Sequence, residues 1–339
     1  MAAEERGIAG DVSPDLILNI GSGFRAAKLL FVASEVGVFE QLAAGPASLN
    51  GLADRLGIAS SRLRVLLNAM VALGLVERRS DDYCNGPEVA AFLSGQTATD
   101  LRPALRFWDH LSFPSWTNLE DTVRTGQARA SIRTDDEQRI FSEGVEALSA
   151  DAARILAITY DFSHHRRLLD LGGGTGSWLT AILRRYGHLQ ATLFDRPGAA
   201  AIARQRLAGD PATRNATVVE GDFWQDPIPP GHDAILVANV LHGLPPERNV
   251  AFLRRVRAAV PAGARLLLAD LWTDPTHTEP LLAPLFAGEF LVYTGDGDVY
   301  SAEEAGAWLG DGGGWRLVEH TPLTGPQSVI VAEAAEPPQ

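Results

Sequence analysis

The stretch LLDLGGGTGSW, residues 168–178, decides the fold of this chain. An apolar run ends in Asp170, four glycines follow within five positions, and a helix is expected to begin near Ser177. Glycine has no Cβ, so the backbone can turn sharply and approach a ligand, and the first N–H groups of the next helix can bind it. The pattern predicts a cofactor site at a strand–turn–helix junction, formed by Asp170, Gly172, Gly173, Gly174 and Gly176.

The segments around this loop predict a parallel sheet. Short, nearly continuous apolar runs alternate there with helical segments: RRLLDL, ATLFD, ATVVEG, DAILVANVL and RLLLADLW. Strands of this kind are buried on both faces by the helices that connect them. The final runs, WRLVEHTPL and SVIVAEA, flank a TGPQ turn and predict an antiparallel hairpin. We therefore expect an α/β fold with a doubly wound, mostly parallel sheet over residues 161–339.

The front of the chain has helical periodicity instead, from about residue 15 to residue 160. Residues 48–86 predict helix, turn, helix and a short hairpin, with Gly57 at the turn and Ser60 or Ser61 capping the second helix. This order is typical of a winged helix. We predict an all-helical winged-helix domain over residues 1–105 and interdomain helices over 106–160.

Composition limits the partners. The chain has 339 residues and a net charge of -13, which disfavours nucleic acid and anionic membranes as partners. The lone cysteine, Cys84, cannot form an internal disulfide, and no stretch reaches the roughly 18 apolar residues of a membrane span. We expect a cytoplasmic protein that binds a small molecule and needs no metal.

The glycine loop resembles that of class I S-adenosylmethionine-dependent methyltransferases. Its glycines alternate after an acidic residue, and Ser177 stands where the dinucleotide fingerprint has a third Gly or Ala. The resemblance implies that Asp195, at the end of the second strand, binds the ribose of S-adenosylmethionine. It also implies that Asp222 accepts from the adenine amino group while Phe223 packs on the ring.

The segment DAILVANVLHGLPPE, residues 233–247, resembles the VLHDW segment of the dimerising, metal-independent small-molecule O-methyltransferases of plants and bacteria. This resemblance implies that His242 is the general base and that Asp270 orients it. A second flanking acid is implied at Glu304, with Glu303 as the alternative. The chain departs from the family pattern at Gly243, where an Asp is usual.

The same resemblance extends over residues 15–335 and has further implications. Asn239 and Ser149 take positions near the cofactor. Glu289 interrupts the apolar face of a helix that lines the acceptor pocket, so it can contact an amine or hydroxyl of the acceptor, although a solvated helix face is an equal alternative. The N-terminal domain implies a homodimer. Possible pocket walls are Trp108, Phe113 and Trp116.

Three other functions compete with O-methylation. One is C-methylation of an aromatic or α-keto acid, in which His242 would abstract a carbon-bound proton. A second is a winged-helix transcription regulator that places Arg62 and Arg64 in a DNA groove; the negative net charge argues against it. A third is a dehydrogenase, disfavoured by Ser177 and by the helical domain placed first.

Overall fold

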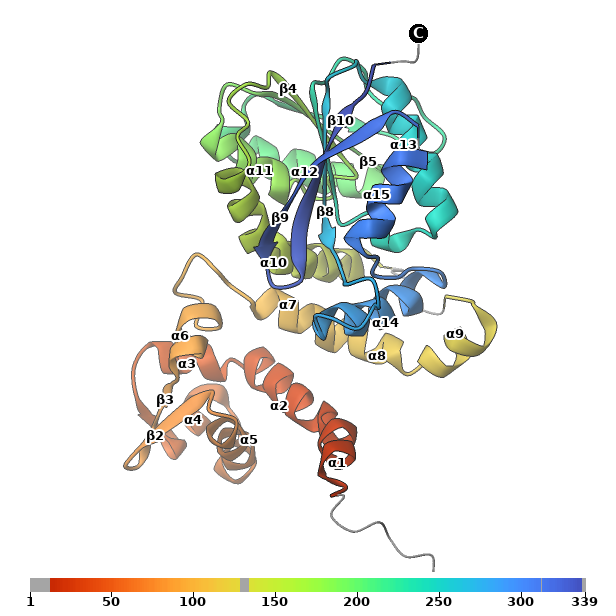
Figure 1. Cartoon of the computed structure of the whole chain (residues 1–339). Coiled ribbons are helices and arrows are strands. Elements are labelled where there is room, and N and C mark those ends of the chain that lie inside the picture. The colour runs from red at the N-terminus through yellow and green to blue at the C-terminus, as the bar shows by residue number, and fades with distance from the viewer. Residues whose placement is uncertain (1–12, 129–133, 312, 337–339) are drawn as a thin grey trace, which may run out of the picture. The chain divides into compact units, whose positions relative to one another are not determined.

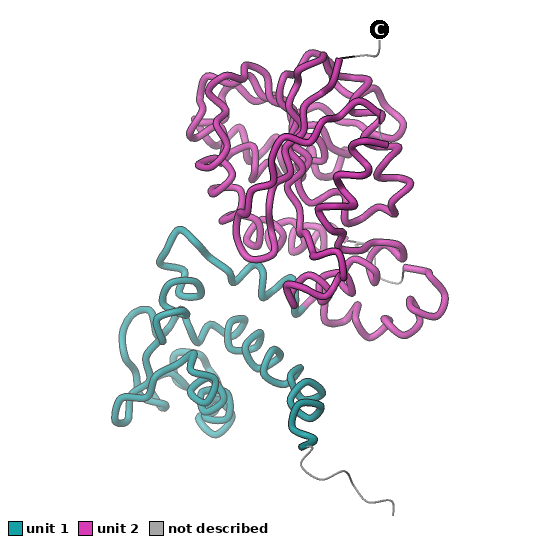
Figure 2. Tube along the Cα trace, in the orientation of Figure 1, with its two compact units in different colours: residues 1–109 teal, residues 110–339 magenta. Residues whose placement is uncertain are grey.

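The computed structural model describes residues 13–128, 134–311 and 313–336. The chain forms two compact units, residues 1–109 and 110–339 (Figure 2). Most of the predicted interdomain segment, residues 106–160, therefore lies inside the second unit.

The first unit is a helical domain with a small sheet. Helices α4 and α5 form the predicted helix–turn–helix around Gly57, which has a left-handed φ of 65°. Strands β2 and β3 pair as the antiparallel hairpin, and β1 pairs with the other side of β3. The winged-helix order is confirmed. The elements are α1 (Asp15–Ser22), α2 (Phe24–Glu35), α3 (Val38–Ala43), β1 (Ala47–Ser48), α4 (Leu49–Leu56), α5 (Ser60–Ala72), β2 (Val76–Arg79), β3 (Asp82–Asn85), α6 (Pro87–Phe92) and α7 (Arg102–Phe107).

Two details of this unit differ from the sequence predictions. Ala59 is the N-cap of α5, and the Ser60 hydroxyl donates to Asn50 Oδ1 at 2.9 Å instead of capping the helix. The prediction of a serine cap is wrong because helix α5 already includes Ser60. In addition, residues 15–35 are long and apolar enough, by length and composition, to cross a membrane. The apolar run of this stretch is hard to see in the sequence because Asn, Gly and Ser interrupt it, and the expectation that no stretch is long enough is corrected here.

The second unit is the predicted doubly wound sheet (Figure 1). Its seven strands have the order β6-β5-β4-β7-β8-β10-β9. The first five are parallel, and β10 is antiparallel to both β8 and β9. The strands are β4 (Arg167–Leu171), β5 (Gln190–Asp195), β6 (Ala216–Glu220), β7 (Ala234–Ala238), β8 (Arg265–Leu271), β9 (Trp315–Thr324) and β10 (Gln327–Ala334).

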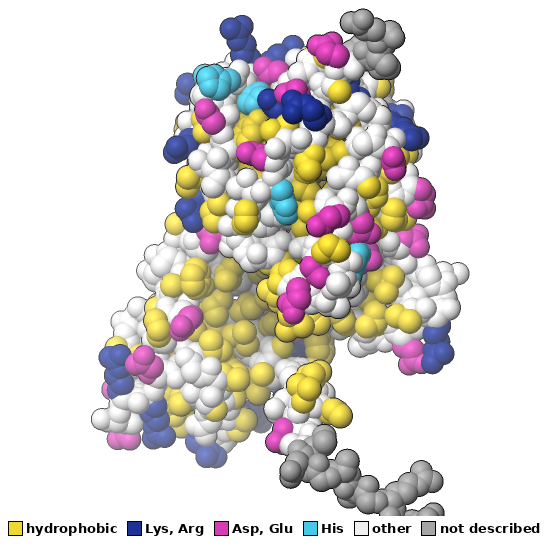
Figure 3. Space-filling view, in the orientation of Figure 1, with side chains coloured by type: hydrophobic (Ala, Val, Ile, Leu, Met, Phe, Trp, Pro, Cys, Tyr) yellow, Lys and Arg dark blue, Asp and Glu magenta, His cyan; other side chains and the backbone are white. Residues whose placement is uncertain are grey.

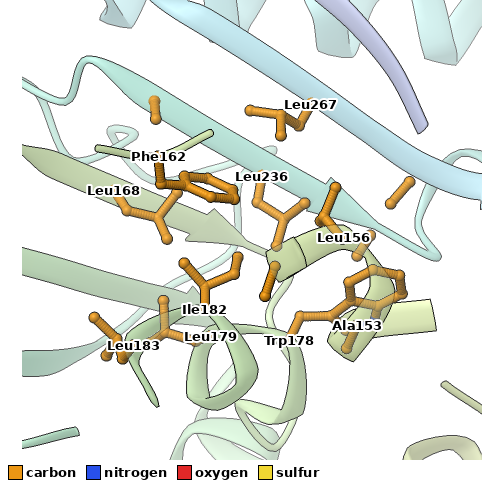
Figure 4. Packing of buried hydrophobic residues seen from close by; sticks show 14 of the residues in the cluster. Ala153, Leu156, Phe162, Leu168, Trp178, Leu179, Ile182, Leu183, Leu236 and Leu267 are labelled. Atoms are coloured by element: carbon orange, nitrogen blue, oxygen red, sulfur yellow. The ribbon is translucent and has the colours of Figure 1, made fainter. Parts of the chain in front are cut away.

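Helices cover both faces of this sheet. On one face Leu156 of α10 and Trp178 of α11 pack against Leu168 and Leu236 of the strands (Figure 4). On the other face α13 and α15 bury Phe252 and Trp308. The helices of this unit are the π-helical turn η1 (Trp108–Ser112, which starts in the first unit), α8 (Phe113–Trp116), α9 (Leu119–Thr125), α10 (Asp135–Thr159), α11 (Ser177–Arg185), α12 (Pro197–Ala208), η2 (Pro211–Thr213), η3 (Leu241–Gly243), α13 (Pro246–Ala259), α14 (Leu282–Thr294) and α15 (Ala302–Asp311).

Candidate functional site

The predicted cofactor loop lies at the carboxyl end of β4, in the middle of the parallel strands. Gly172, Gly174 and Gly176 have φ values of 77°, 55° and 84°, a conformation that side chains with a Cβ rarely adopt. A Cβ on Gly172 would lie 2.9 Å from Val240 Cγ2, whereas a Cβ on Gly174 would meet nothing within 4 Å. Gly174 therefore presents its backbone to open space, as a ligand cradle requires.

Asp170 supports this loop from below. Its side chain is completely buried, and a Cβ on Gly173 would lie 2.6 Å from its Oδ2. Burial, and next the charge of Asp195, raise the pKa of Asp170 to about 7, while the backbone N–H of Leu179 opposes the rise. The sequence placed Asp170 among the cofactor ligands, but its burial fits a residue that packs under the glycines.

Asp195, at the end of β5, is hydrogen-bonded to the glycine loop that follows the neighbouring strand β4. Its Oδ2 accepts the Gly174 N–H at 2.7 Å, and its Oδ1 accepts the Arg196 N–H at 2.7 Å. The carboxylate thus reaches the glycine loop, where the sequence expects it to bind a ribose. The following α12 adds a contact that the sequence gave no sign of: Arg206 pairs with Glu146 of α10 and donates to Thr175 Oγ1 at 3.0 Å.

Asp222 and Phe223 follow β6 at the same edge of the sheet. Asp222 Oδ1 accepts the Trp224 N–H at 2.7 Å, so the carboxylate also stabilises a local turn. The Phe223 ring packs edge-on against Phe252 at 4.9 Å and lies near Gly172. The structure therefore brings Phe223 to the glycine loop, as expected.

Ser149 and Asn239, which lie far apart in the sequence, meet in the structure. Asn239 Nδ2 donates to Ser149 Oγ at 3.0 Å, and Gln327 Nε2 donates to Asn239 Oδ1 at 3.4 Å. Asn239 itself has a positive φ of 56° at the end of β7, a conformation that Asn tolerates better than most residues. Gln327 was not predicted, since its position depends on how β10 pairs in the sheet.

His242 and Asp270 form a close polar pair at the ends of two strands. The His242 Nδ1 atom lies 2.6 Å from Asp270 Oδ1, and the aspartate is almost fully buried. The other oxygen accepts the backbone N–H groups of Leu241 and His242 at 3.2 and 3.4 Å. Asp270 therefore fixes both the imidazole and the backbone that carries it. The pair combines the carboxyl ends of two adjacent strands, β7 and β8.

Two further contacts hold the histidine, and neither was predicted. The Phe290 ring of α14 stacks on the imidazole with ring centres 3.7 Å apart and planes 8° apart. The buried Asn249 of α13 donates to the carbonyls of Leu241 and Leu244 at 3.1 and 3.2 Å, on either side of His242. A phenylalanine in an apolar helix and an asparagine in an amphipathic one carry no sequence signal for such a role.

Glu304 lies elsewhere. Its carboxylate accepts from the Ser301 N–H and hydroxyl at 2.7 and 2.9 Å and pairs with His277 at 3.0 Å. It thus forms an N-terminal cap for α15, and of the described carboxylates it is Asp270 that contacts His242. Assigning Glu304 as a flanking acid does not match this geometry. In the described part of the chain, no hydrogen bond or ion pair joins Glu303 to His242.

The residues predicted to line the acceptor pocket do not form one cluster in the structure. Glu289 is buried and accepts from the Ser112 hydroxyl at 2.7 Å and from Trp116 Nε1. Burial raises the pKa of Glu289, and these two hydrogen bonds oppose the rise. Trp108 instead packs against the core of the first unit. Phe113 is 37% exposed.

Comparison with known proteins identifies the family. Residues 116–313 match the model of the O-methyltransferase domain, and residues 18–93 match that of the O-methyltransferase dimerisation domain. This chain belongs to the O-methyltransferase family. The methyltransferase is 32% identical over 308 residues to 3-hydroxy-5-methyl-1-naphthoate 3-O-methyltransferase of Streptomyces sahachiroi, covering 88% of this chain and 89% of that one.

Two other relatives extend this picture. The methyltransferase is 28% identical to the tetracenomycin polyketide synthesis 8-O-methyl transferase of Streptomyces glaucescens, covering 94% and 96% of the two chains. Human N-acetylserotonin methyltransferase, solved in complex with S-adenosylmethionine, superposes with a TM-score of 0.88 at 25% identity, covering 97% of this chain and 100% of that one. The methyltransferase is an S-adenosylmethionine-dependent enzyme, and the regulator and dehydrogenase alternatives are set aside.

Proposed function

We propose that this methyltransferase transfers a methyl group to a hydroxyl of a small aromatic natural-product acceptor, with His242 as general base. The observation that carries the proposal is the 2.6 Å contact between His242 Nδ1 and Asp270. The relatives that methylate a hydroxynaphthoate and a tetracenomycin polyketide support an aromatic acceptor.

The contact with Asp270 determines which nitrogen can act as a base. A carboxylate accepts a hydrogen bond, so the proton of a neutral imidazole lies on Nδ1, and Nε2 keeps a free electron pair. Asp270 also stabilises the imidazolium that forms once Nε2 has taken a proton. Stacking on Phe290 holds the ring in one plane. His242 is therefore oriented to remove a proton from a hydroxyl placed against Nε2.

The residues at the glycine loop fit S-adenosylmethionine. We assign Gly172, Gly174, Gly176 and Asp195 to its amino acid and ribose parts, and Asp222 and Phe223 to its adenine. Open space at Gly174 and the carboxylate of Asp195 beside it support this assignment. Ser149 and Asn239, joined by a hydrogen bond, form the polar boundary on the β7 side. When bound, the cofactor supplies an activated methyl group on a sulfonium.

The protein's own part is positioning and proton removal. His242 Nε2 would take the hydroxyl proton as the acceptor oxygen bonds to the methyl group, which the bound cofactor would supply with a thioether as the leaving group. A phenol has an ordinary pKa near 10, so base assistance raises the rate at neutral pH. Holding the acceptor in line contributes the larger share of the rate.

We also propose that the enzyme works as a cytoplasmic homodimer. Residues 18–93 match a dimerisation domain, and apolar side chains of α1 are exposed (Figure 3). Packing against a second copy of the chain would remove these apolar side chains from water, so no membrane is needed to cover them. The exposed fractions are 71% for Leu16, 75% for Ile17, 60% for Leu18 and 73% for Ile20.

The test combines calorimetry with turnover. We expect S-adenosylhomocysteine to bind with one site per subunit, and Asp195→Ala to abolish that binding. A panel of phenols and naphthols with labelled S-adenosylmethionine should then give O-methyl ethers. His242→Ala should lower kcat by about 100-fold or more while leaving S-adenosylhomocysteine affinity nearly unchanged. Equal turnover would overturn the base assignment, and label on a ring carbon would favour C-methylation.

A further inference from the structure

Helix α14 carries a single charged residue, Glu289, and its side chain points into the protein. Only 8% of the residue is exposed. The remaining residues of Leu282–Thr294 are apolar, small or hydroxyl-bearing. Burying a carboxylate costs free energy unless hydrogen bonds replace water at both of its oxygens. The surroundings of the two oxygens therefore show what the carboxylate is for.

One oxygen of the carboxylate, Oε2, accepts two hydrogen bonds from side chains. The Ser112 hydroxyl donates to it at 2.7 Å from the end of the π-helical turn η1, and Trp116 Nε1 donates from α8. Gly288 makes room for the indole, because a Cβ there would lie 2.8 Å from Trp116 Cη2. Isolated π-helical turns occur frequently at functional sites. These contacts fix the direction of the carboxylate.

The other oxygen, Oε1, is buried and has no hydrogen-bond partner in the part of the chain that the structure describes. An unsatisfied buried polar atom destabilises the protein, and it does so more strongly when it is charged. Burial opposes ionisation of Glu289, whereas the two groups that donate to Oε2 stabilise the carboxylate, in which Oε1 can only accept. The missing partner of the carboxylate is therefore a hydrogen-bond donor.

The position of Glu289 relates this oxygen to the acceptor. The next residue of α14, Phe290, stacks on the ring of His242. Helix α14, which contacts the proposed base, thus also carries the carboxylate whose Oε1 has no hydrogen-bond partner among the described residues. Oε1 is buried in the ligand-free protein, so a donor that arrives with the acceptor would complete the site only when the side chains covering this oxygen move aside.

We propose that Glu289 Oε1 accepts a hydrogen bond from a hydroxyl or amino group of the acceptor, distinct from the hydroxyl that is methylated. This inference rests on the proposed function and narrows its acceptor class to aromatic molecules with a second donor. Sites built to bind a polar hydrogen discriminate strongly against analogues that lack it, because the protein group is then left unpaired. Glu289 is a specificity-determining residue in this scheme.

The test uses pairs of probes that differ only in the second donor. Isomeric dihydroxynaphthalenes and aminonaphthols are compared with the corresponding methoxynaphthols, by kcat/KM and by calorimetric binding to the complex with S-adenosylhomocysteine. We expect at least one donor-bearing isomer to exceed its methoxy partner by about 10-fold or more. The Glu289→Gln variant should remove or reverse this preference, since its amide can turn an N–H toward the acceptor.

The control variant is Glu120→Gln, which makes the same change at an exposed ion pair on α9 and should leave the preference intact. If Glu289→Gln does not fold, Ser112→Ala removes one of the donors that orient the carboxylate and should weaken the preference several-fold. An unchanged preference in these variants would overturn the inference. Donor-selective binding without O-methyl product would support it and count against the proposed reaction. Absence of any donor preference in binding would overturn the inference even if turnover were observed.

Discussion

The carboxylate of Asp170 fills the space beside Gly173, so closely that a Cβ on this glycine would lie 2.6 Å from Oδ2. The acid is fully buried, and its pKa is raised to about 7, chiefly by burial. The folded protein therefore holds the Asp170 proton more tightly than the unfolded chain does. The stability that this proton contributes is complete below about pH 4 and is lost as the pH rises through about 7.

Asp170→Asn should remove this pH dependence. The difference between the two pKa values corresponds to roughly 4 kcal/mol of folding free energy, taken as an upper bound. We expect the ligand-free variant to have a higher Tm than the wild type at about pH 8 and a smaller advantage at about pH 5. Thermal melts at both pH values check this, and equal advantages at both would contradict the assignment to Asp170.

Gly174→Ala should separate backbone strain from ligand binding. The positive φ of Gly174 costs an alanine about 1 kcal/mol, and no neighbouring atom adds a clash. Gly263→Ala is the matched control, with a φ of 80° and equally open space in the loop before β8. Both variants should lose similar stability, but the Gly174 variant alone should lose about 10-fold or more in S-adenosylhomocysteine affinity. Equal affinities in calorimetry would place the cofactor elsewhere.

Asp270→Asn should impair the base while leaving the cofactor site intact. The amide can donate to His242 Nδ1, which moves the imidazole proton to Nε2 and removes the free electron pair. We expect kcat to fall by about 100-fold or more with an ordinary phenol. A nitrophenol, already ionised near neutral pH, should lose far less rate. Equal losses for both acceptors would show that Asp270 has only a structural role.

Arg206→Gln should make the glycine loop less rigid, because it removes the hydrogen bond from Arg206 to Thr175. Arg206 links Thr175 to Glu146 of α10, and its side chain is 40% exposed, so the stability loss should stay near about 1 kcal/mol. S-adenosylhomocysteine affinity should fall a few-fold. Arg184→Gln breaks a comparable exposed pair with Asp210 and should spare the affinity. Calorimetric titration of the two variants with S-adenosylhomocysteine checks this prediction. Identical affinities in both variants would exclude a role of Arg206 in the glycine loop.

The sequence was sufficient for locating the strands along the chain and the residues at their ends, because apolar runs and glycines report local backbone structure. The roles of Asp195, His242 and Asp270 came from the family resemblance of the segments at these strand ends. The sequence was not sufficient for partners that come together only through packing. Phe290 resembles any core residue of an apolar helix, and Gln327 belongs to a hairpin far along the chain. Glu304 was assigned as the second flanking acid by resemblance, with Glu303 as the alternative, and its capping contact with Ser301 depends on the fold around α15.

The order of the strands has an evolutionary consequence. Apart from Ser149 on α10 and Asn239 after β7, the groups assigned to the cofactor follow β4, β5 and β6 on one side of the sheet, whereas His242 and Asp270 follow β7 and β8 on the other. Mutations that change the acceptor or the base that activates it can therefore accumulate near β7 and β8 without disturbing most of the S-adenosylmethionine site. Such a division lets a gene duplicate acquire a new acceptor while retaining its cofactor, and offers the same freedom to enzyme engineering.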